Sequence, residues 1–584
     1  MNKPIIIKNQ RFLHRASNIL VYPFLFLLTM GTFFPLQAQQ NDPVNQPTVI
    51  QSSGSLYESL YQLLVAELAA TRGMKDLATT HYLNVASISQ DPKIAEQATL
   101  LAIQFEAPKE AILSAVLWAK IDPQNLEAQL IAMTLLISQS LEEATPFLKQ
   151  ALEINPQDLD QHILEIQRHL SKSSALALKK AIIELAKANP ANPYAAFVAA
   201  QSAAEESDVP KAKSWVNKAL ELMPSLTRAI ELKARIIRYE RESNTPAIRF
   251  LAKEVDRYPD NHELRFYYAN ALYDDSQVEE AKEELSRLTH DNKLGGPAIL
   301  FLGEILIHEK EWQEASTTLK KGLEDPTIRS GAAYLLGEVS EHQGHSEKAI
   351  EWYSEVAPGP FHIPAVLRAI TLLKKNKDYQ EAIYLIHNSS PNTPEEQKYL
   401  LLSEIELLNS NRQSEDALQL ANEILPVLPN DQDILYTRAL TAIKLKKWEI
   451  AEQDLKKIID ENPNNASALN ALGYALSFHQ GRLKEALNYL QQALSISPNN
   501  PDFLDSLGWI YYRLGDLSEA IRYLQEANDL SNTSATAAHL GEVLWVTNQQ
   551  EEAVNVWKNA LQQDSDHEEL VTTLKRLKVN LNAF

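Results

Sequence analysis

Two side chains near the C-terminus have the spacing of a metal-binding pair. His539 and Glu542 are three residues apart and therefore share one face of a predicted helix, where an imidazole and a carboxylate could ligate zinc together. A zinc site needs further ligands, and no second pair of this kind lies nearby in the sequence. We therefore interpret His539 as a structural histidine and predict neither a metal site nor a cofactor.

The chain also lacks the motifs of common catalytic chemistry. None of its 584 residues is cysteine, which excludes disulfides, thiolate zinc sites, iron–sulfur ligation and a cysteine nucleophile. It contains no HExxH zinc-protease helix, GxSxG nucleophile elbow, P-loop or GxGxxG phosphate loop. We predict that the protein has no catalytic residues and is not an enzyme. An enzyme with a site buried in a groove remains a remote alternative.

The elements that carry His539 and Glu542 belong to a repeated pattern between residues 465 and 565. Three times the sequence runs Leu-Gly, a large apolar residue three positions later, a short polar turn and then an alanine. The three alanines are 34 and 33 residues apart: Ala486, Ala520 and Ala553. Self-similarity at such a period predicts stacked helical hairpins and not one globular core.

This stretch resembles the tetratricopeptide repeat (TPR), in which small residues flank the turn and a late proline, here Pro498, closes the second helix. The resemblance implies an all-α superhelical solenoid. Prolines at intervals of 33 to 35 residues carry the pattern toward the N-terminus: Pro123, Pro156, Pro190, Pro224 and Pro259. We expect about fifteen helix-turn-helix repeats over residues 56–567, clearest at 466–565, and a capping helix at 568–584. Leu178 replaces the usual alanine in the fourth repeat.

Residues 1–38 read as a secretory signal peptide. Basic residues precede the apolar run Ile19–Leu36, and Ala38 is a plausible cleavage position before the polar leader 39–55. The alternative is an uncleaved anchor, because eighteen apolar residues can span a bilayer. Either reading predicts a solenoid facing the periplasm, envelope-associated after cleavage or anchored in the inner membrane. Membrane contact is expected only if Ile19–Leu36 is retained.

The formal net charge is -21, which makes the chain a poor candidate for nucleic-acid binding. We expect instead a protein or peptide partner. By resemblance, the first helix of each TPR hairpin lines the concave face, at its second, fifth, ninth and twelfth positions. Those positions and one adjoining arginine give the predicted binding residues: Asn470, Tyr474, Asp505, Trp509, Tyr512, Arg513, Glu542 and Trp545.

Aromatic, amide and carboxylate groups of this kind suit an extended peptide or a partner helix. The competing interpretation is that Tyr474, Trp509 and Trp545 pack between adjacent helices. Acids dominate this set and only Arg513 is basic, so we do not expect a ligand held by its C-terminal carboxylate.

The N-terminal unit, together with the segments DSLGWIYYRLG and AAHLGEVLW of the best repeats, resembles exported proteobacterial TPR proteins of poorly defined role. The resemblance implies a non-enzymatic interaction scaffold or adaptor of the cell envelope. A membrane-anchored TPR factor for envelope assembly or regulation is the alternative.

Overall fold

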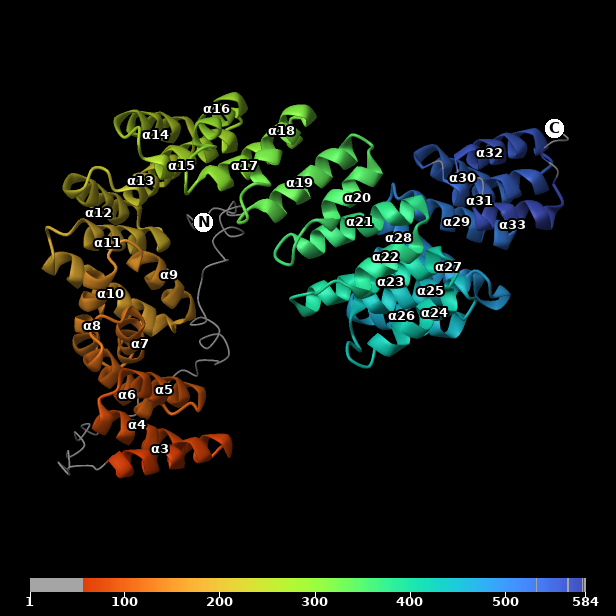
Figure 1. Ribbon diagram of the computed structural model, residues 1–584. Coiled ribbons are helices and arrows are strands. Elements are labelled where there is room, and N and C mark those ends of the chain that lie inside the picture. The colour runs from red at the N-terminus through yellow and green to blue at the C-terminus, as the bar shows by residue number, and fades with distance from the viewer. Residues whose placement is uncertain (1–55, 532, 564–566, 580, 582–584) are drawn as a thin grey trace. The chain divides into compact units, whose positions relative to one another are not determined.

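A computed structural model of the chain describes residues 56–531, 533–563, 567–579 and 581 (Figure 1). Within these ranges every regular element is a helix: 31 α-helices and one short 3-10 helix, η1 (Gln480–Arg482). The predicted all-α solenoid of about fifteen hairpins is confirmed. The predicted signal segment 1–38, with its apolar run Ile19–Leu36, and the leader 39–55 lie outside the described residues. None of the described helices is both long and apolar enough to cross a membrane.

The chain divides into two compact units, Met1–Ile328 and Arg329–Phe584. The described part of the first unit consists of eight hairpins, whose helices are α3 (Leu56–Thr71), α4 (Lys75–Ser89), α5 (Pro92–Gln104), α6 (Pro108–Ile121), α7 (Leu126–Leu136), α8 (Leu141–Ile154), α9 (Leu159–His169), α10 (Lys172–Ala188), α11 (Pro193–Glu205), α12 (Val209–Leu222), α13 (Thr227–Arg241), α14 (Thr245–Arg257), α15 (His262–Asp274), α16 (Val278–Leu288), α17 (Gly295–His308) and α18 (Trp312–Gly322).

The described part of the second unit consists of seven hairpins and a final single helix. Its helices are α19 (Arg329–His342), α20 (Ser346–Ser354), α21 (His362–Asn376), α22 (Tyr379–His387), α23 (Pro394–Ser410), α24 (Ser414–Ile424), α25 (Gln432–Lys444), α26 (Trp448–Glu461), α27 (Ala466–Leu476), α28 (Leu483–Ile496), α29 (Pro501–Leu514), α30 (Leu517–Leu530), α31 (Ser534–Val546), α32 (Gln550–Gln563) and α33 (Glu568–Leu577).

Local sequence fixes where many of these helices end and begin. Second helices α6, α8, α10, α12 and α14 each end two residues before one of the regularly spaced prolines, as predicted. Proline cannot continue a helix, because it lacks the backbone N–H and restricts the residue before it. An asparagine side chain then accepts a hydrogen bond from a backbone N–H in the first turn of several first helices, the usual N-cap arrangement: Asn125, Asn192, Asn261, Asn465 and Asn500.

The Leu-Gly glycines mark the place where the two helices of a hairpin come closest. A Cβ atom added to Gly508 in α29 would lie 2.6 Å from Cγ of Leu524 in α30. At Gly541 in α31 it would lie 2.2 Å from Nε1 of Trp557 in α32. Both distances are far below van der Waals contact, so the large residue of the second helix occupies the space that a side chain would need.

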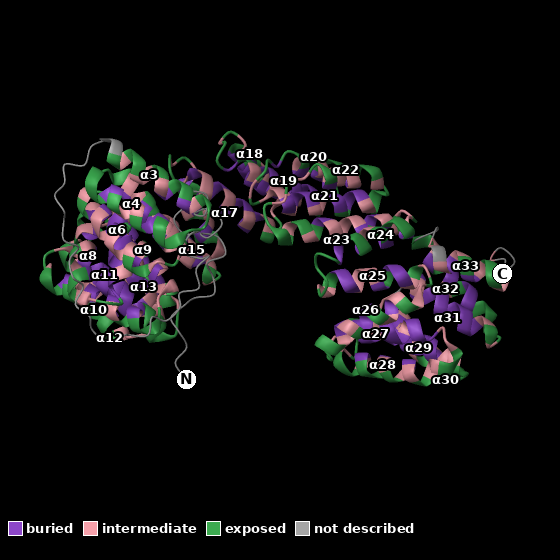
Figure 2. Ribbon diagram, turned by 90° about the horizontal axis from the view of Figure 1, so that it is seen from below, coloured by how far each residue is buried: buried purple, intermediate pink, exposed green. Residues whose placement is uncertain are grey.

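The hydrophobic core runs through each unit as a chain of contacts between successive helices. Buried residues face the neighbouring helices and exposed residues face outward (Figure 2). Leu178 takes the place of the small alanine in α10 and is fully buried among side chains of α8, α9 and α11. The fourth repeat thus keeps its core despite losing the recognisable residue at that position.

Candidate functional site

The predicted binding residues lie on α27, α29 and α31, the first helices of the last three hairpins. Trp509 and Tyr512 are in ring contact, with centroids 5.2 Å apart, and the Tyr512 hydroxyl donates to Glu542 Oε1 on the next helix at 3.4 Å. Glu542 also forms an ion pair with Arg576 of α33. These side chains therefore form one continuous surface across successive first helices, which we call the C-terminal inner surface.

His539 lies at the centre of this surface. Its Nδ1 is 2.8 Å from Oδ2 of Asp505 on α29, and its Nε2 is 3.2 Å from Oε1 of Glu569 on α33. The indole of Trp509 stacks on the imidazole with centroids 4.3 Å apart, and Tyr474 of α27 lies at 6.4 Å. The histidine thus links three helices by two hydrogen bonds and an aromatic stack.

Electrostatics keep His539 charged. Burial lowers the pKa of a histidine, but the carboxylates of Asp505 and Glu569 outweigh burial and raise the pKa of His539 to about 10. His539 correspondingly lowers the pKa of Glu569, against the effect of burial. A protonated imidazole with both nitrogens bound to carboxylates can serve neither as a general base nor as a metal ligand. Among the described residues no group of three histidines or acids is arranged to hold a metal ion.

The surface carries more positive charge than the predicted binding residues alone. Arg513, the one basic residue among them, lies with its guanidinium 5.8 Å from the ring centroid of Phe478. His539 and Arg576 add two further cations, each paired with a carboxylate. Neither lies at one of the four groove positions, so the resemblance to the TPR did not place them on this surface. Arg576 could have been found from the repeat period, since it follows Glu542 by 34 residues.

The aromatic residues are more buried than an open groove would require. Trp509 is 8% exposed and packs between α29 and α31, so the competing interpretation holds for this residue. Tyr474 and Trp545 are half-buried. Trp545 turns toward the second helix α32, where its ring centroid is 5.8 Å from that of Trp557.

Three buried polar atoms on this surface make no hydrogen bond within the described part of the chain. They are Oδ1 of Asn470, Oδ1 of Asp505 and Nε1 of Trp509. Asn470 and Asp505 stand at the same position of successive repeats, and Trp509 follows Asp505 by one helical turn. Two acceptors and one donor are thus placed side by side on α27 and α29.

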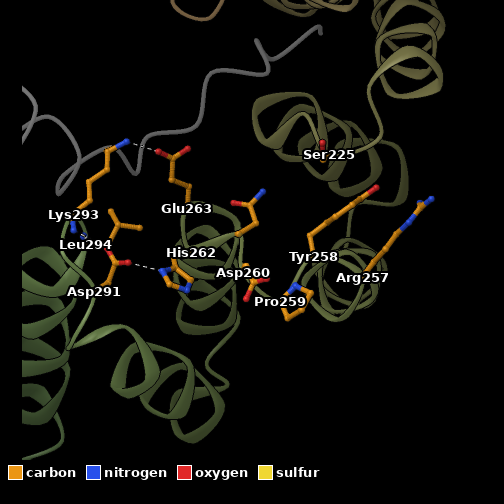
Figure 3. A pocket seen from close by; sticks show the side chains of 11 residues that line it. Ser225, Arg257, Tyr258, Pro259, Asp260, His262, Glu263, Asp291, Lys293 and Leu294 are labelled. Carbon is orange, nitrogen blue, oxygen red and sulfur yellow. Dashed lines mark hydrogen bonds and ion pairs between the residues drawn. The ribbon is translucent and has the colours of Figure 1, made fainter.

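A pocket of about 610 Å³ lies in the first unit, where the turns before α13, α15 and α17 meet (Figure 3). Its charged groups pair with one another: His262 with Asp291 at 2.5 Å, and Lys293 with Glu263 at 2.5 Å. Arg257 lies with its guanidinium 5.4 Å from the ring centroid of Tyr258. These side chains tie adjacent repeats together and include no pairing of a nucleophile with a base.

Comparison with known proteins identifies the repeat. Family models of the tetratricopeptide repeat match residues 129–158, 436–501 and 477–541. A TPR repeat-containing protein of Pseudomonas aeruginosa is 31% identical over 490 residues, which cover 83% of this chain and 82% of that protein. The chain belongs to the tetratricopeptide repeat family. TPR solenoids are typically scaffolds for protein–protein interaction, so a protein partner follows from membership of the family, whereas its identity does not.

Solved TPR structures match the chain in part or along most of its length. A thermophilic TPR protein of Thermus thermophilus is 25% identical and covers 31% of this chain and 98% of its own, with a TM-score of 0.29. Cut9, seen in a hetero-tetramer with Hcn1, is 14% identical and covers 89% and 96%, with a TM-score of 0.34.

Proposed function

We propose that this TPR protein is a non-enzymatic scaffold or adaptor of the bacterial cell envelope, and that its C-terminal inner surface binds a peptide or helix of a partner protein. The observation that carries this proposal is the set of three buried polar atoms on Asn470, Asp505 and Trp509. A buried donor or acceptor without a partner costs about 1–3 kcal/mol, so a ligand that draws these side chains toward it would relieve that cost.

The chemistry of the three atoms suits a polypeptide. Main-chain N–H groups of a bound segment can donate to the oxygens of Asn470 and Asp505, and a carbonyl can accept from Trp509 Nε1. The half-buried rings of Tyr474 and Tyr512 border these atoms and offer apolar contact area. The protonated His539 holds Asp505 in place, so the surface is organised before the partner arrives.

The test compares two variants in a pull-down with the intact protein. Asn470→Ala with Trp509→Phe removes one acceptor and the indole donor but keeps an aromatic ring against His539. Asn488→Ala, on the exposed face of α28, is the matched control. We expect the partner to be lost only with the first variant. Equal recovery from both folded variants would refute binding at this surface.

The envelope location rests on residues 1–38. We propose export with cleavage near Ala38, which leaves a periplasmic or envelope-associated protein, and we regard an inner-membrane anchor at Ile19–Leu36 as the alternative. The mass and N-terminal sequence of the native protein separate the two: a chain that starts at Gln39 supports cleavage, whereas one that retains Ile19–Leu36 supports the anchor.

A further inference from the structure

Helix α13 of the first unit has a charge opposite to that of the chain. Its sequence, TRAIELKARIIRYER, contains five basic and two acidic residues, so the helix carries +3 in a protein of net charge -21. Four of its polar residues recur at intervals of three and four positions and therefore share one face of the helix. They are Arg228, Glu231, Arg235 and Arg238, here called the α13 stripe.

Contacts with other first helices place this stripe on the inner side of the repeats. Arg235 Nη2 donates to Oε1 of Gln201 on α11 at 3.2 Å, across one repeat. Arg228 reaches across two repeats: its Nη1 and Nη2 each lie 2.5 Å from an oxygen of Asp160 on α9. In Figure 1 the second helices α12, α14 and α16 lie on the outside of the curve that this unit makes.

The four charged side chains of the stripe differ in how far their charges are neutralised by partners. Arg228 is already held by Asp160 and by the Gln157 carbonyl at 3.0 Å, and its guanidinium lies 5.6 Å from the ring centroid of Phe197. Glu231 is half-buried next to the arginines. Burial raises the pKa of Glu231 to about 7, although Arg235 and Arg228 oppose that rise. The carboxylate of Glu231 therefore neutralises its neighbours only in part.

Neither Arg235 nor Arg238 forms an ion pair with a carboxylate within the described part of the chain, although Glu231 and Asp274 lie close enough to interact with them through their charges. Arg235 bonds only to the neutral amide of Gln201, and within the described ranges Arg238 makes no hydrogen bond or ion pair. Both residues are half-buried. The phenol of Tyr267 on α15 is close enough for the two arginines to act on its pKa. Two arginines without a direct ion pair in the described residues thus lie near Tyr267 in a strongly acidic protein.

We propose that the α13 stripe is a second binding surface, which holds a carboxylate-rich segment of a partner protein through Arg235 and Arg238. A guanidinium presents two parallel N–H donors that match the two oxygens of a carboxylate. The acidic remainder of the protein repels such a segment, so the segment is expected to bind at the α13 stripe and not elsewhere on the surface. This surface lies in the other unit from Asn470 and Trp509 and has the opposite chemistry, so either proposal can fail alone.

Nearby acids argue against nucleic acid as the occupant. Asp160, Glu263 and Asp274 lie close enough to the stripe to act on Glu231 or to be acted on by Arg238. These acids repel phosphates and carboxylates alike, but a phosphate backbone repeats its charge at every nucleotide, whereas a peptide can place uncharged residues beside the acids.

The test uses the full chain and two defined peptides. A fluorescein-labelled peptide of alternating glutamate and alanine is titrated with the protein, and the same peptide with glutamine in place of glutamate is the control probe. Fluorescence anisotropy should show binding of the glutamate peptide that weakens with salt, and at least about tenfold weaker binding of the glutamine peptide. Equal binding of the two peptides, or none of either, would overturn the proposal.

Two charge-matched variants locate the site. Arg235→Gln with Arg238→Gln should weaken binding of the glutamate peptide by about tenfold or more. Arg249→Gln with Lys253→Gln removes the same charge from exposed positions of α14 and should leave the affinity within about twofold. An equal loss in both would show that only net charge matters, which overturns the assignment to α13.

Two further measurements keep the test decisive. If Arg235→Gln with Arg238→Gln does not fold, Arg235→Lys with Arg238→Lys retains the charge and should still bind several-fold more weakly, because lysine lacks the paired donors. Unchanged affinity would refute pairing by the guanidinium groups. A labelled single-stranded oligonucleotide that binds more tightly than the glutamate peptide would assign the stripe to nucleic acid instead.

Discussion

The indole of Trp509 stacks on the imidazole of His539, with ring centroids 4.3 Å apart and planes inclined by 25°. Because Asp505 and Glu569 keep His539 protonated, the indole face meets a cation, an attraction that adds to the contact of the two rings. The pair joins α29 to α31, and Glu569 extends the connection to α33. The last hairpins and the final helix are therefore held by one charged side chain as well as by their apolar core.

We expect His539→Phe to lower the free energy of unfolding by about 1.5–3 kcal/mol, the typical value of hydrogen bonds to charged groups. Phenylalanine preserves an aromatic ring against Trp509 but leaves Asp505 and Glu569 without their partner. Urea unfolding followed by circular dichroism measures the change. His479→Phe, at a half-buried position, is the control and should cost less. Similar losses in the two variants would mean that the carboxylate pairing contributes nothing.

The contribution of the His539 charge should depend on pH. Its folded-state pKa of about 10 exceeds the ordinary value of 6.5, so the folded protein holds a proton that the unfolded chain releases between these values. The stabilisation is therefore fully present below about pH 6.5 and is lost as the pH rises through about 10. The difference in melting temperature between the wild type and His539→Phe should shrink over this window. A constant difference would contradict a charged His539.

Gly541→Ala should destabilise the protein by about 1–3 kcal/mol, because the new methyl group would lie 2.2 Å from Trp557 Nε1 and would force the two helices apart. Gly481→Ala is a matched control. Nothing lies within 4 Å of a Cβ at Gly481, so that change should be close to neutral. Thermal unfolding distinguishes the two, and a neutral Gly541→Ala would show that the hairpin can open without cost.

Glu231→Gln should remove a pH-dependent loss of stability from the first unit. The folded protein holds the Glu231 proton up to about pH 7, whereas the unfolded chain releases it near 4.5, so wild-type stability falls as the pH rises between these values. Melting temperatures on either side of this window should differ less in Glu231→Gln than in the wild type. Glu221→Gln, at an exposed position of α12, should keep the wild-type dependence. An unchanged profile in both would mean that Glu231 is ionised throughout.

The repeat architecture was predictable because a local rule fixes it in nearly every hairpin. The prolines end second helices two residues upstream, and the glycines at 508 and 541 admit a large residue from the facing helix. Pro146 shows the limit of the rule, since it lies inside α8 and does not end the helix. One proline without the regular spacing carries no information about a boundary.

The C-terminal inner surface was predictable only in part, because its contacts join residues about one repeat apart. His539 looked isolated in the sequence, yet its carboxylate partners precede and follow it by 34 and 30 residues. The α13 stripe escaped notice because the groove positions were read only in the three clearest repeats. Counted forward from Gln201 by the 34-residue period, the same positions lead to Arg235 and then to the rest of the stripe.

The bond between Arg228 and Asp160 spans 68 residues and passes over α11, although repeats in a solenoid ordinarily touch only their immediate neighbours. A solenoid under tension lengthens because each junction between neighbouring repeats rotates by a small amount. Between α9 and α13 the ion pair of Arg228 with Asp160 opposes that rotation. This segment of the first unit should therefore be stiffer than the turns on either side, and a force applied along the protein would stretch it last.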